Sequence, residues 1–483
     1  MRPVVASGNV SPAQHRRGQS GLAFAPRSFD AVNTALSLDA VNFLLADVRG
    51  ALGPYLNVFL VTQQHWSQSS VGLVTTLGGL LGLAVQTPIG AAIDATRWKR
   101  GIIVAALTVL GASAVIIYAV PRFWPVMVAN TLIAVVGDVF GPAIAALTLG
   151  LCARTALARR MGRNAAFDHA GNVAIAATAG GVGWAFSQRS VFLLVPIFAA
   201  LAAAAVLSIP SAAIDHARAR GADAADSTET QAAPASLWRV LSGCRPLLVF
   251  GCCALLFHLA NAPLLPLVGQ KLAAAHKDVA TAMMSACIIA AQLIMLPIAI
   301  AVGRNADRLG RKPILLIGFA VLPIRAVLYT FSNQTWWLIG VQLLDGVGAG
   351  IFGAITPLVI ADLMHGTGRF NAAQGAVATL QGIGAASSGL IAGVIVDHAG
   401  YPAAFLAAAV IASIALAALT LLMPETMSPA RGMHSPDRGG PARYPMQSDR
   451  CCGAKPGWPC ENLPANARGR RGAVRADRPG AMP

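Results

Sequence analysis

The chain has 483 residues, of which 55% are hydrophobic and only 12% are charged, and its formal net charge at pH 7 is +16. An ordinary soluble domain carries about a quarter charged residues, so this composition argues against a soluble enzyme and against a disordered chain. A basic protein could bind nucleic acid, but the Lys and Arg residues stand in short loops between apolar runs and form no basic stripe with interleaved aromatic residues. We therefore expect a membrane protein with no nucleic-acid partner.

The first predicted segment is a polar, Arg-bearing lead over residues 1–35, which has neither the apolar stretch nor the cleavage site of a secretory signal. It is expected to be disordered and cytoplasmic. A helix needs about 20 mainly apolar residues to cross the hydrocarbon core of a bilayer. Six such runs follow and predict an N-terminal six-helix bundle over residues 36–209. Their predicted edges are 36–61, 71–93, 101–120, 124–150, 165–187 and 190–209.

The longest polar break covers residues 210–245 and is predicted to be a cytoplasmic linker. Six more apolar runs then predict a C-terminal six-helix bundle over residues 246–424. A tail over residues 425–483, rich in Pro, Gly and Arg, cannot bury a core and is expected to be disordered, basic and cytoplasmic. The fold class is therefore an all-α polytopic membrane protein with twelve transmembrane helices in two bundles. The second six spans are 246–268, 279–302, 313–331, 336–361, 371–396 and 401–423.

Lys and Arg predict the orientation, because they accumulate in short cytoplasmic loops. The loops on one side carry basic clusters within 97–100, 154–163 and 304–312, whereas the alternate loops carry only Arg122, Arg189, Lys271 and Lys277. The clustered side is therefore expected to be cytoplasmic, together with both termini. The expected location is the cytoplasmic (inner) membrane of a bacterium.

The two predicted halves repeat one another. Pro54 and Pro266 are 212 residues apart, and so are Asn130 and Gln342. Because each half has six spans, both halves keep the same orientation, and the repeat is related by an axis along the membrane normal. Transporters with a central site between two halves use this arrangement. A channel or an intramembrane enzyme can also be duplicated, so the repeat alone does not decide the function.

Two loops at equivalent positions of the halves carry a related pattern of Gly, Asp and basic residues. Gly lets two helices approach closely, Asp at a helix end can pair with a basic group across the loop, and the basic cluster holds the loop at the cytoplasmic face. If this pattern only set the orientation of the helices in the membrane, one copy of it would suffice. The first copy has Gly90, Asp94 and Arg97, and the second has Gly303, Asp307, Arg308, Gly310, Arg311 and Lys312.

Two such loops in a six-plus-six chain resemble the major facilitator superfamily, and the resemblance covers about residues 36–424. It implies that the loops are gate elements, in which Asp94 and Asp307 contact the neighbouring half and stabilise the outward-open state. Many proton-coupled members carry an Arg in the fourth span, twelve residues before a Pro. Here Pro142 fits this pattern but the Arg position holds Asn130, which leaves the direction of coupling open.

Polar residues at mid-membrane depth are the candidate substrate or proton-coupling site, because ionisable groups are costly there and are often functional. The resemblance implies that spans 1, 4, 7 and 10 face a cavity. Arg49 is predicted to pair with Asp138 in one state, with substrate or a proton competing for the pair, and His258 is a candidate proton carrier. The alternative is a permanent structural pair and an inert His258. The candidates are Asp47, Arg49, Asp138, His258, Asn261 and Asp345.

Arg325 and Asp345 lie on consecutive predicted spans. Because span 9 is peripheral in the family that the chain resembles, a pair between these two residues is expected to be structural. This leaves two interpretations of Asp345, one as a cavity residue and one as part of an ion pair.

These features predict a secondary active transporter that moves a small solute by alternating access, with protons as the expected coupling ion and with uptake or efflux open. The sequence holds no Gly-x-x-x-x-Gly-Lys-Ser/Thr, His-Glu-x-x-His or Gly-x-Ser-x-Gly pattern, so we expect no enzyme, no cofactor and no metal. The expected partners are a small-molecule substrate, protons and the lipid bilayer, and the chain is expected to be a monomer. The alternative function is a non-transporting membrane sensor or assembly factor that retains the transporter fold.

Overall fold

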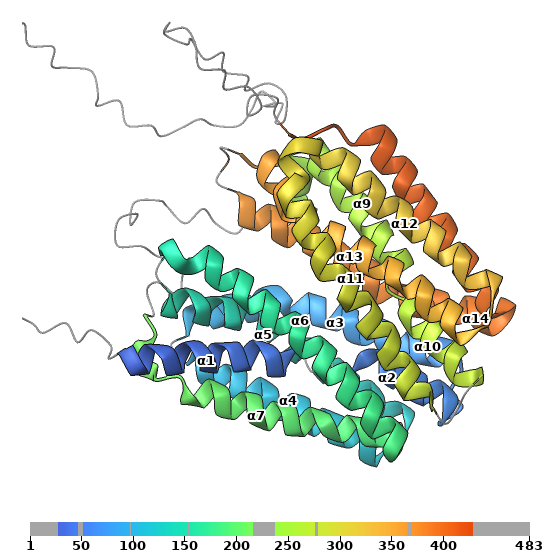
Figure 1. Ribbon diagram of the computed structural model, residues 1–483, viewed down its shortest axis with the longest axis horizontal. Coiled ribbons are helices and arrows are strands. Elements are labelled where there is room, and N and C mark those ends of the chain that lie inside the picture. The colour runs from blue at the N-terminus through green and yellow to red at the C-terminus, as the bar shows by residue number, and fades with distance from the viewer. Residues whose placement is uncertain are drawn as a thin grey trace, which may run out of the picture.

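A computed structural model describes residues 28–46, 52–96, 98–152, 154–215, 237–275, 279–365, 367 and 369–427. The described part is helical and contains no strand. Figure 1 shows its helices gathered side by side in two bundles. The first bundle contains α1 (Ser28–Leu45), α2 (Gly53–Thr62), α3 (Gln68–Ala95), α4 (Lys99–Ala119), α5 (Phe123–Leu151), α6 (Arg154–Ala185), η2 (Arg189–Leu193) and α7 (Leu194–Ser208).

The second bundle follows η3 (Ser211–Ala213) and the short helix α8 (Leu237–Ser242). The linker predicted over residues 210–245 therefore includes two short helical pieces, and residues 216–236 lie outside the described part. The helices of this bundle are α9 (Arg245–Asn261), α10 (Leu264–Ala275), α11 (Ala280–Leu309), α12 (Arg311–Phe331), α13 (Thr335–Leu363) and α14 (Phe370–Leu422).

Nine helical segments of the described part are long and apolar enough to cross a membrane. One of them, α14, has 53 residues, which at about 1.5 Å per residue is roughly 80 Å and more than two bilayer cores. Its backbone is broken at Gly400, where φ is 80°, so α14 makes the two passes predicted as separate spans. With the pair α1–α2 and with α6, these segments give the twelve predicted passes. Two edges differ, because α1 begins at Ser28 and α6 at Arg154.

Each bundle packs around its own set of apolar side chains. One buried cluster is built mainly from α1 to α7 and includes Phe59, Phe140 and Phe192. The other is built from α8 to α14 and includes Phe250 and Phe319. Figure 1 shows the two bundles close together near α2 and α10 and separated toward the end at which α1 begins.

The separated end is the one that carries the basic loops. We call it the basic end, defined by the connections at 95–99, 151–154 and 309–311. The contacts between the bundles lie away from it. The Thr76 hydroxyl donates to the carbonyl of Ala386 over 2.6 Å, and the hydroxyls of Tyr55 and Ser285 are 2.8 Å apart. The halves are thus closed at the far end and apart at the basic end.

The internal repeat is also a repeat of contacts. Arg100, one residue into α4, donates to the carbonyl of Leu207 at the end of α7 over 3.3 Å. Lys312, which stands 212 positions later, donates to the carbonyl of Thr420 at the end of α14 over 2.8 Å. Cationic side chains stabilise the last carbonyls of a helix. In each half, therefore, a cationic side chain at the start of the third membrane pass (α4 or α12) binds the end of the sixth pass (α7 or the end of α14).

Candidate functional site

A cavity of about 470 Å³ lies between α3 and α5, and the predicted site residue Asp138 lines it. The close packing of the two helices positions this carboxylate. A Cβ atom at Gly82 would lie 3.2 Å from Oδ2 of Asp138, so the absence of a side chain there leaves room for the acid. Eight residues before Asp138, the Asn130 amide donates to the carbonyl of Val74 over 3.1 Å and ties α5 to α3. The other polar lining comes from Thr75 and Gln86.

Asp138 lies near the middle of the 29-residue helix α5 and is half-buried. Among the described residues its carboxylate has no hydrogen-bond or ion-pair partner. The partner expected from the sequence, Arg49, and its neighbour Asp47 lie outside the described residues, so the Arg49–Asp138 pair stays a prediction. A carboxylate at this depth, facing a cavity, can take up a proton or accept a hydrogen bond from a solute.

Three polar groups of the second bundle come together from α9, α12 and α13. The Arg325 guanidinium, only 2% exposed, forms an ion pair with Oδ1 of Asp345 and donates to Oδ1 of Asn261 over 2.6 Å. The other oxygen of Asp345 accepts from the Gln342 amide over 2.9 Å. The predicted Arg325–Asp345 pair is confirmed. Asp345 and Asn261 are therefore held by Arg325 in this conformation, and a role of either in substrate binding stays a prediction.

His258 lies apart from the Asp138 cavity, on α9. Its Nδ1 is 2.9 Å from the carbonyl oxygen of Ala254, and since a carbonyl can only accept, Nδ1 carries the proton. The imidazole meets the rings of Phe257 and Phe352 edge-on, with centroids 5.6 and 5.0 Å away. The structure therefore does not bring His258 and Asp138 into one site, and proton transfer through His258 stays a prediction.

The second copy of the loop motif is centred on Arg311. Its Nη2 donates to Asp307 over 2.8 Å, and its Nε donates to Asp362, at the end of α13, over 3.0 Å. The Asp307 side chain is 89% exposed and is paired within its own half in this conformation. Gly303 lies within α11, Gly310 connects α11 to α12, and Arg308 is exposed.

The first copy of the motif is only partly described. Gly90 and Asp94 lie within α3, but the surroundings of Gly90 and the side chain of Asp94 are outside what the structure describes, and Arg97 is not among the described residues. A contact of Asp94 or Asp307 with the opposite half therefore stays a prediction for the outward-open state.

Glu425 completes the second loop, and sequence reasoning did not single it out. Its two carboxylate oxygens accept the backbone N–H groups of Arg311 and Lys312, each over 3.0 Å, at the start of α12. Gly310, with φ +87°, allows this approach, because a Cβ there would lie 2.8 Å from Glu425. Burial raises the pKa of Glu425, but hydrogen bonds from four backbone N–H groups outweigh this effect, so the pKa lies below its ordinary value.

Replacing Glu425 by Ala is expected to lower the free energy of unfolding by about 0.5–1 kcal/mol, the lower range for losing a helix cap, because this side chain is exposed. Since the folded-state pKa is depressed, the stabilisation is complete above the ordinary carboxyl pKa and is lost as pH falls through the lower folded value. Unfolding in denaturant at neutral and at acidic pH measures both effects. A difference between wild type and variant that grows on acidification would contradict the assignment.

Comparison with known sequences shows the family of this chain. The model of the Major Facilitator Superfamily matches residues 38–304 and 250–443. Two proteins of Mycobacterium tuberculosis, from strains CDC 1551 / Oshkosh and ATCC 25618 / H37Rv, are each named an uncharacterized MFS-type transporter. Each is 46% identical over 407 residues, which cover 84% of this chain and 97% of the relative.

Two solved structures share the fold. A mutant of the nucleoside transporter NupG aligns with a TM-score of 0.67 at 15% identity, covering 81% of this chain and 100% of the other. A bacterial homolog of the human lysosomal transporter Spinster, in an inward-facing and unoccupied conformation, aligns with a TM-score of 0.67 at 14% identity. That alignment covers 84% of this chain and 100% of the other.

Proposed function

The chain belongs to the major facilitator superfamily, and on this premise we propose that it moves a small solute by alternating access and couples the movement to protons through Asp138. Membership makes the protein a multi-pass membrane transporter and not an enzyme. The coupling ion, the solute and the direction are the proposed part. We further place the chain in the cytoplasmic membrane as a monomer with both termini inside.

The observation that carries the coupling proposal is the Asp138 carboxylate, which lines a cavity of about 470 Å³ without a partner among the described residues. A charged carboxylate is costly at mid-membrane depth. Protonation removes the charge, and a cationic or hydrogen-bond-donor group of the solute stabilises it. Asp138 can therefore alternate between proton and solute, which is the requirement for coupling the two.

The alternating-access part is supported by the arrangement of the two halves. They are in contact away from the basic end and separate toward it (Figure 1). If Lys and Arg lie on the cytoplasmic side, this conformation is inward-facing. The reverse state would require the contacts between α3 and α14 to open and the basic end to close, with the two loop motifs as the gate. Uptake and efflux use the same pair of states.

The test is solute-induced proton movement in proteoliposomes that contain the purified full chain and a pH-sensitive dye. We expect at least one class in a panel of sugars, amino acids, organic anions and amines to cause a pH change. This change should fall in Asp138→Asn to the level of protein-free liposomes, because the amide cannot exchange a proton. Asp437→Asn, the same substitution in the C-terminal tail, is the matched control and should behave like wild type.

Solute uptake without a pH change, or a pH change that persists in Asp138→Asn, would contradict proton coupling through this residue. Silence across the panel, with the protein shown to be folded and inserted, would favour the alternative of a sensor or assembly factor that retains the transporter fold.

A further inference from the structure

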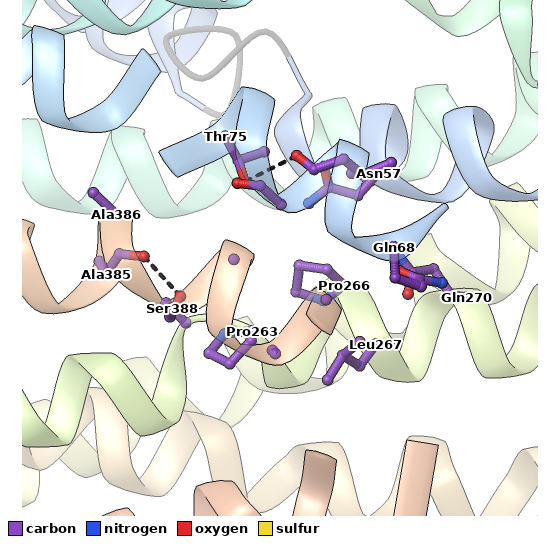
Figure 2. A pocket seen from close by; sticks show the side chains of 16 residues that line it. Asn57, Gln68, Thr75, Pro263, Pro266, Leu267, Gln270, Ala385, Ala386 and Ser388 are labelled. Atoms are coloured by element: carbon purple, nitrogen blue, oxygen red, sulfur yellow. Dashed lines mark hydrogen bonds between the residues drawn. The ribbon is translucent and has the colours of Figure 1, made fainter. Parts of the chain in front are cut away.

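A second cavity, of about 130 Å³, lies between the two halves at the far side from the basic end, and we call it the inter-half pocket. Its walls come from α2, α3, α10 and α14, and Figure 2 shows the polar side chains of Asn57, Gln68 and Gln270 at its rim and walls. Thr75 lines both this pocket and the Asp138 cavity. The two spaces therefore adjoin along α3.

The side-chain oxygens of two amides in this pocket accept no hydrogen bond from the described part of the chain. Gln270 is only 2% exposed, and its buried Oε1 has no partner among the described residues. The buried Oδ1 of Asn57 is also without a partner in the described part of the chain. Buried polar atoms in folded proteins are nearly always hydrogen-bonded to protein, water or ligand. These two oxygens therefore call for a donor that the described protein atoms do not supply.

The two amides are equivalent in the internal repeat. Asn57 on α2 and Gln270 on α10 are 213 positions apart, the spacing that also relates Leu207 to Thr420. One acceptor thus comes from each half, at corresponding places on the two facing helices. A ligand that donates a hydrogen bond to each of these oxygens would contact both halves at once.

The two hydroxyls of the pocket also offer lone pairs rather than protons. The Thr75 hydroxyl donates to the carbonyl of Gly72 over 3.0 Å, and the Ser388 hydroxyl donates to that of Ala385 over 2.7 Å. Their oxygens are left to accept. No ionisable residue is among the residues that line the pocket. The adjacent carboxylate of Asp397 accepts the backbone N–H groups of Gln68 and Ser69.

We propose that the inter-half pocket is a second binding site, for a small uncharged molecule that carries N–H or O–H donors. A charged ligand would be desolvated there without a counter-charge. A water molecule occupies about 30 Å³ in the liquid, so the pocket holds a group of roughly four non-hydrogen atoms. Only the statement that this site lies beside the transport path rests on the proposed function. Binding of a ligand in the pocket requires neither proton coupling nor transport.

Acetamide and acetone test the site directly, because they have the same number of non-hydrogen atoms and differ in their donors. Saturation-transfer NMR on the full chain in detergent reports which of them contacts the protein. We expect transfer to the acetamide methyl group in wild type and transfer to acetone only at the micelle background. The double variant Asn57→Leu/Gln270→Met keeps side-chain size and removes both acceptors. In this variant the saturation transfer to acetamide should fall to the micelle background.

Gln63→Met is the matched control, since Gln63 is exposed and lies outside the pocket, and it should retain the acetamide signal. Thermal unfolding of each variant establishes that it is folded. Equal transfer to acetamide and acetone in wild type, no transfer to either, or an undiminished acetamide signal in a folded double variant would each overturn the proposal. Because no ion gradient is used, these results are independent of whether Asp138 couples transport to protons.

Discussion

Replacing Arg325 by Met is expected to lower the free energy of unfolding by about 3–5 kcal/mol, the range for breaking a buried ion pair from one side. The substitution leaves the Asp345 carboxylate and the Asn261 amide without the guanidinium that holds them. Asp345 would retain only its hydrogen bond from Gln342. Unfolding of the purified chain in mixed micelles, followed by helical circular dichroism, measures the loss.

The double variant Arg325→Met/Asp345→Leu distinguishes a lost pair from lost packing. Replacing both charges by apolar groups of similar size is often neutral or stabilising, so we expect it to recover most of the stability. Arg122→Met, the same substitution at an exposed position, should change stability by no more than about 0.5 kcal/mol. If the double variant is as unstable as the single one, the effect belongs to packing and the pair contributes little.

The sequence predicts the passes and the repeat because both depend on local chemistry. An apolar run can be recognised in the sequence without knowing which helices pack against it. A constant offset such as that between Asn130 and Gln342 can likewise be found from the sequence alone. The early starts of α1 at Ser28 and α6 at Arg154 were missed. Hydropathy marks where a helix meets the hydrocarbon core, and a helix can continue past that boundary into water.

Contacts between distant residues could not be predicted in the same way. Asp39 on α1 is bound by Arg160 and Arg163, more than 120 residues away. Glu425 reaches the start of α12 across 114 residues. Nothing in a hydropathy pattern states which carboxylate meets which cation, because that depends on the rotation and depth of each helix.

The same distinction between local chemistry and long-range packing applies to the candidate site. Asp138 stands out in the sequence as an acid at mid-membrane depth, and the structure gives it a cavity. Its surroundings on α3, Gly82 and Gln86, depend on how α3 and α5 are registered against each other. The unpartnered amide oxygens of Asn57 and Gln270 carry no charge, so composition and depth gave no reason to select these residues, and only the packing between the halves reveals them.

Gly72→Ala is expected to open the contact between α3 and α14 and to reduce the population closed at the far end roughly 10- to 100-fold. The new Cβ would lie 2.3 Å from the carbonyl oxygen of Gly389 and 2.7 Å from Cα of Leu390. These are backbone atoms of the opposite half, so a rotamer change cannot relieve the overlap. Overpacking of this kind costs about 1–3 kcal/mol, and each 1.4 kcal/mol is tenfold in a two-state equilibrium.

The readout is labelling of Ser388→Cys, a buried position in the inter-half pocket, by a membrane-impermeant maleimide added to the side opposite the basic end. Labelling should increase in Gly72→Ala, with the same chain lacking Ser388→Cys giving the background from native thiols. Gly384→Ala is the matched control on α14, because its Cβ would lie 2.2 Å from the carbonyl oxygen of Leu255 within the same half.

The two glycines separate conformational change from loss of stability. The overlap at Gly384 exists in every state in which the second half is folded, so Gly384→Ala should lower the unfolding midpoint without selectively raising labelling. The overlap at Gly72 exists only while the halves touch, so the protein escapes it by opening and keeps its fold. Equal labelling in the two variants would mean that the α3–α14 contact does not open as a gate, and alternating access would then need a different moving surface.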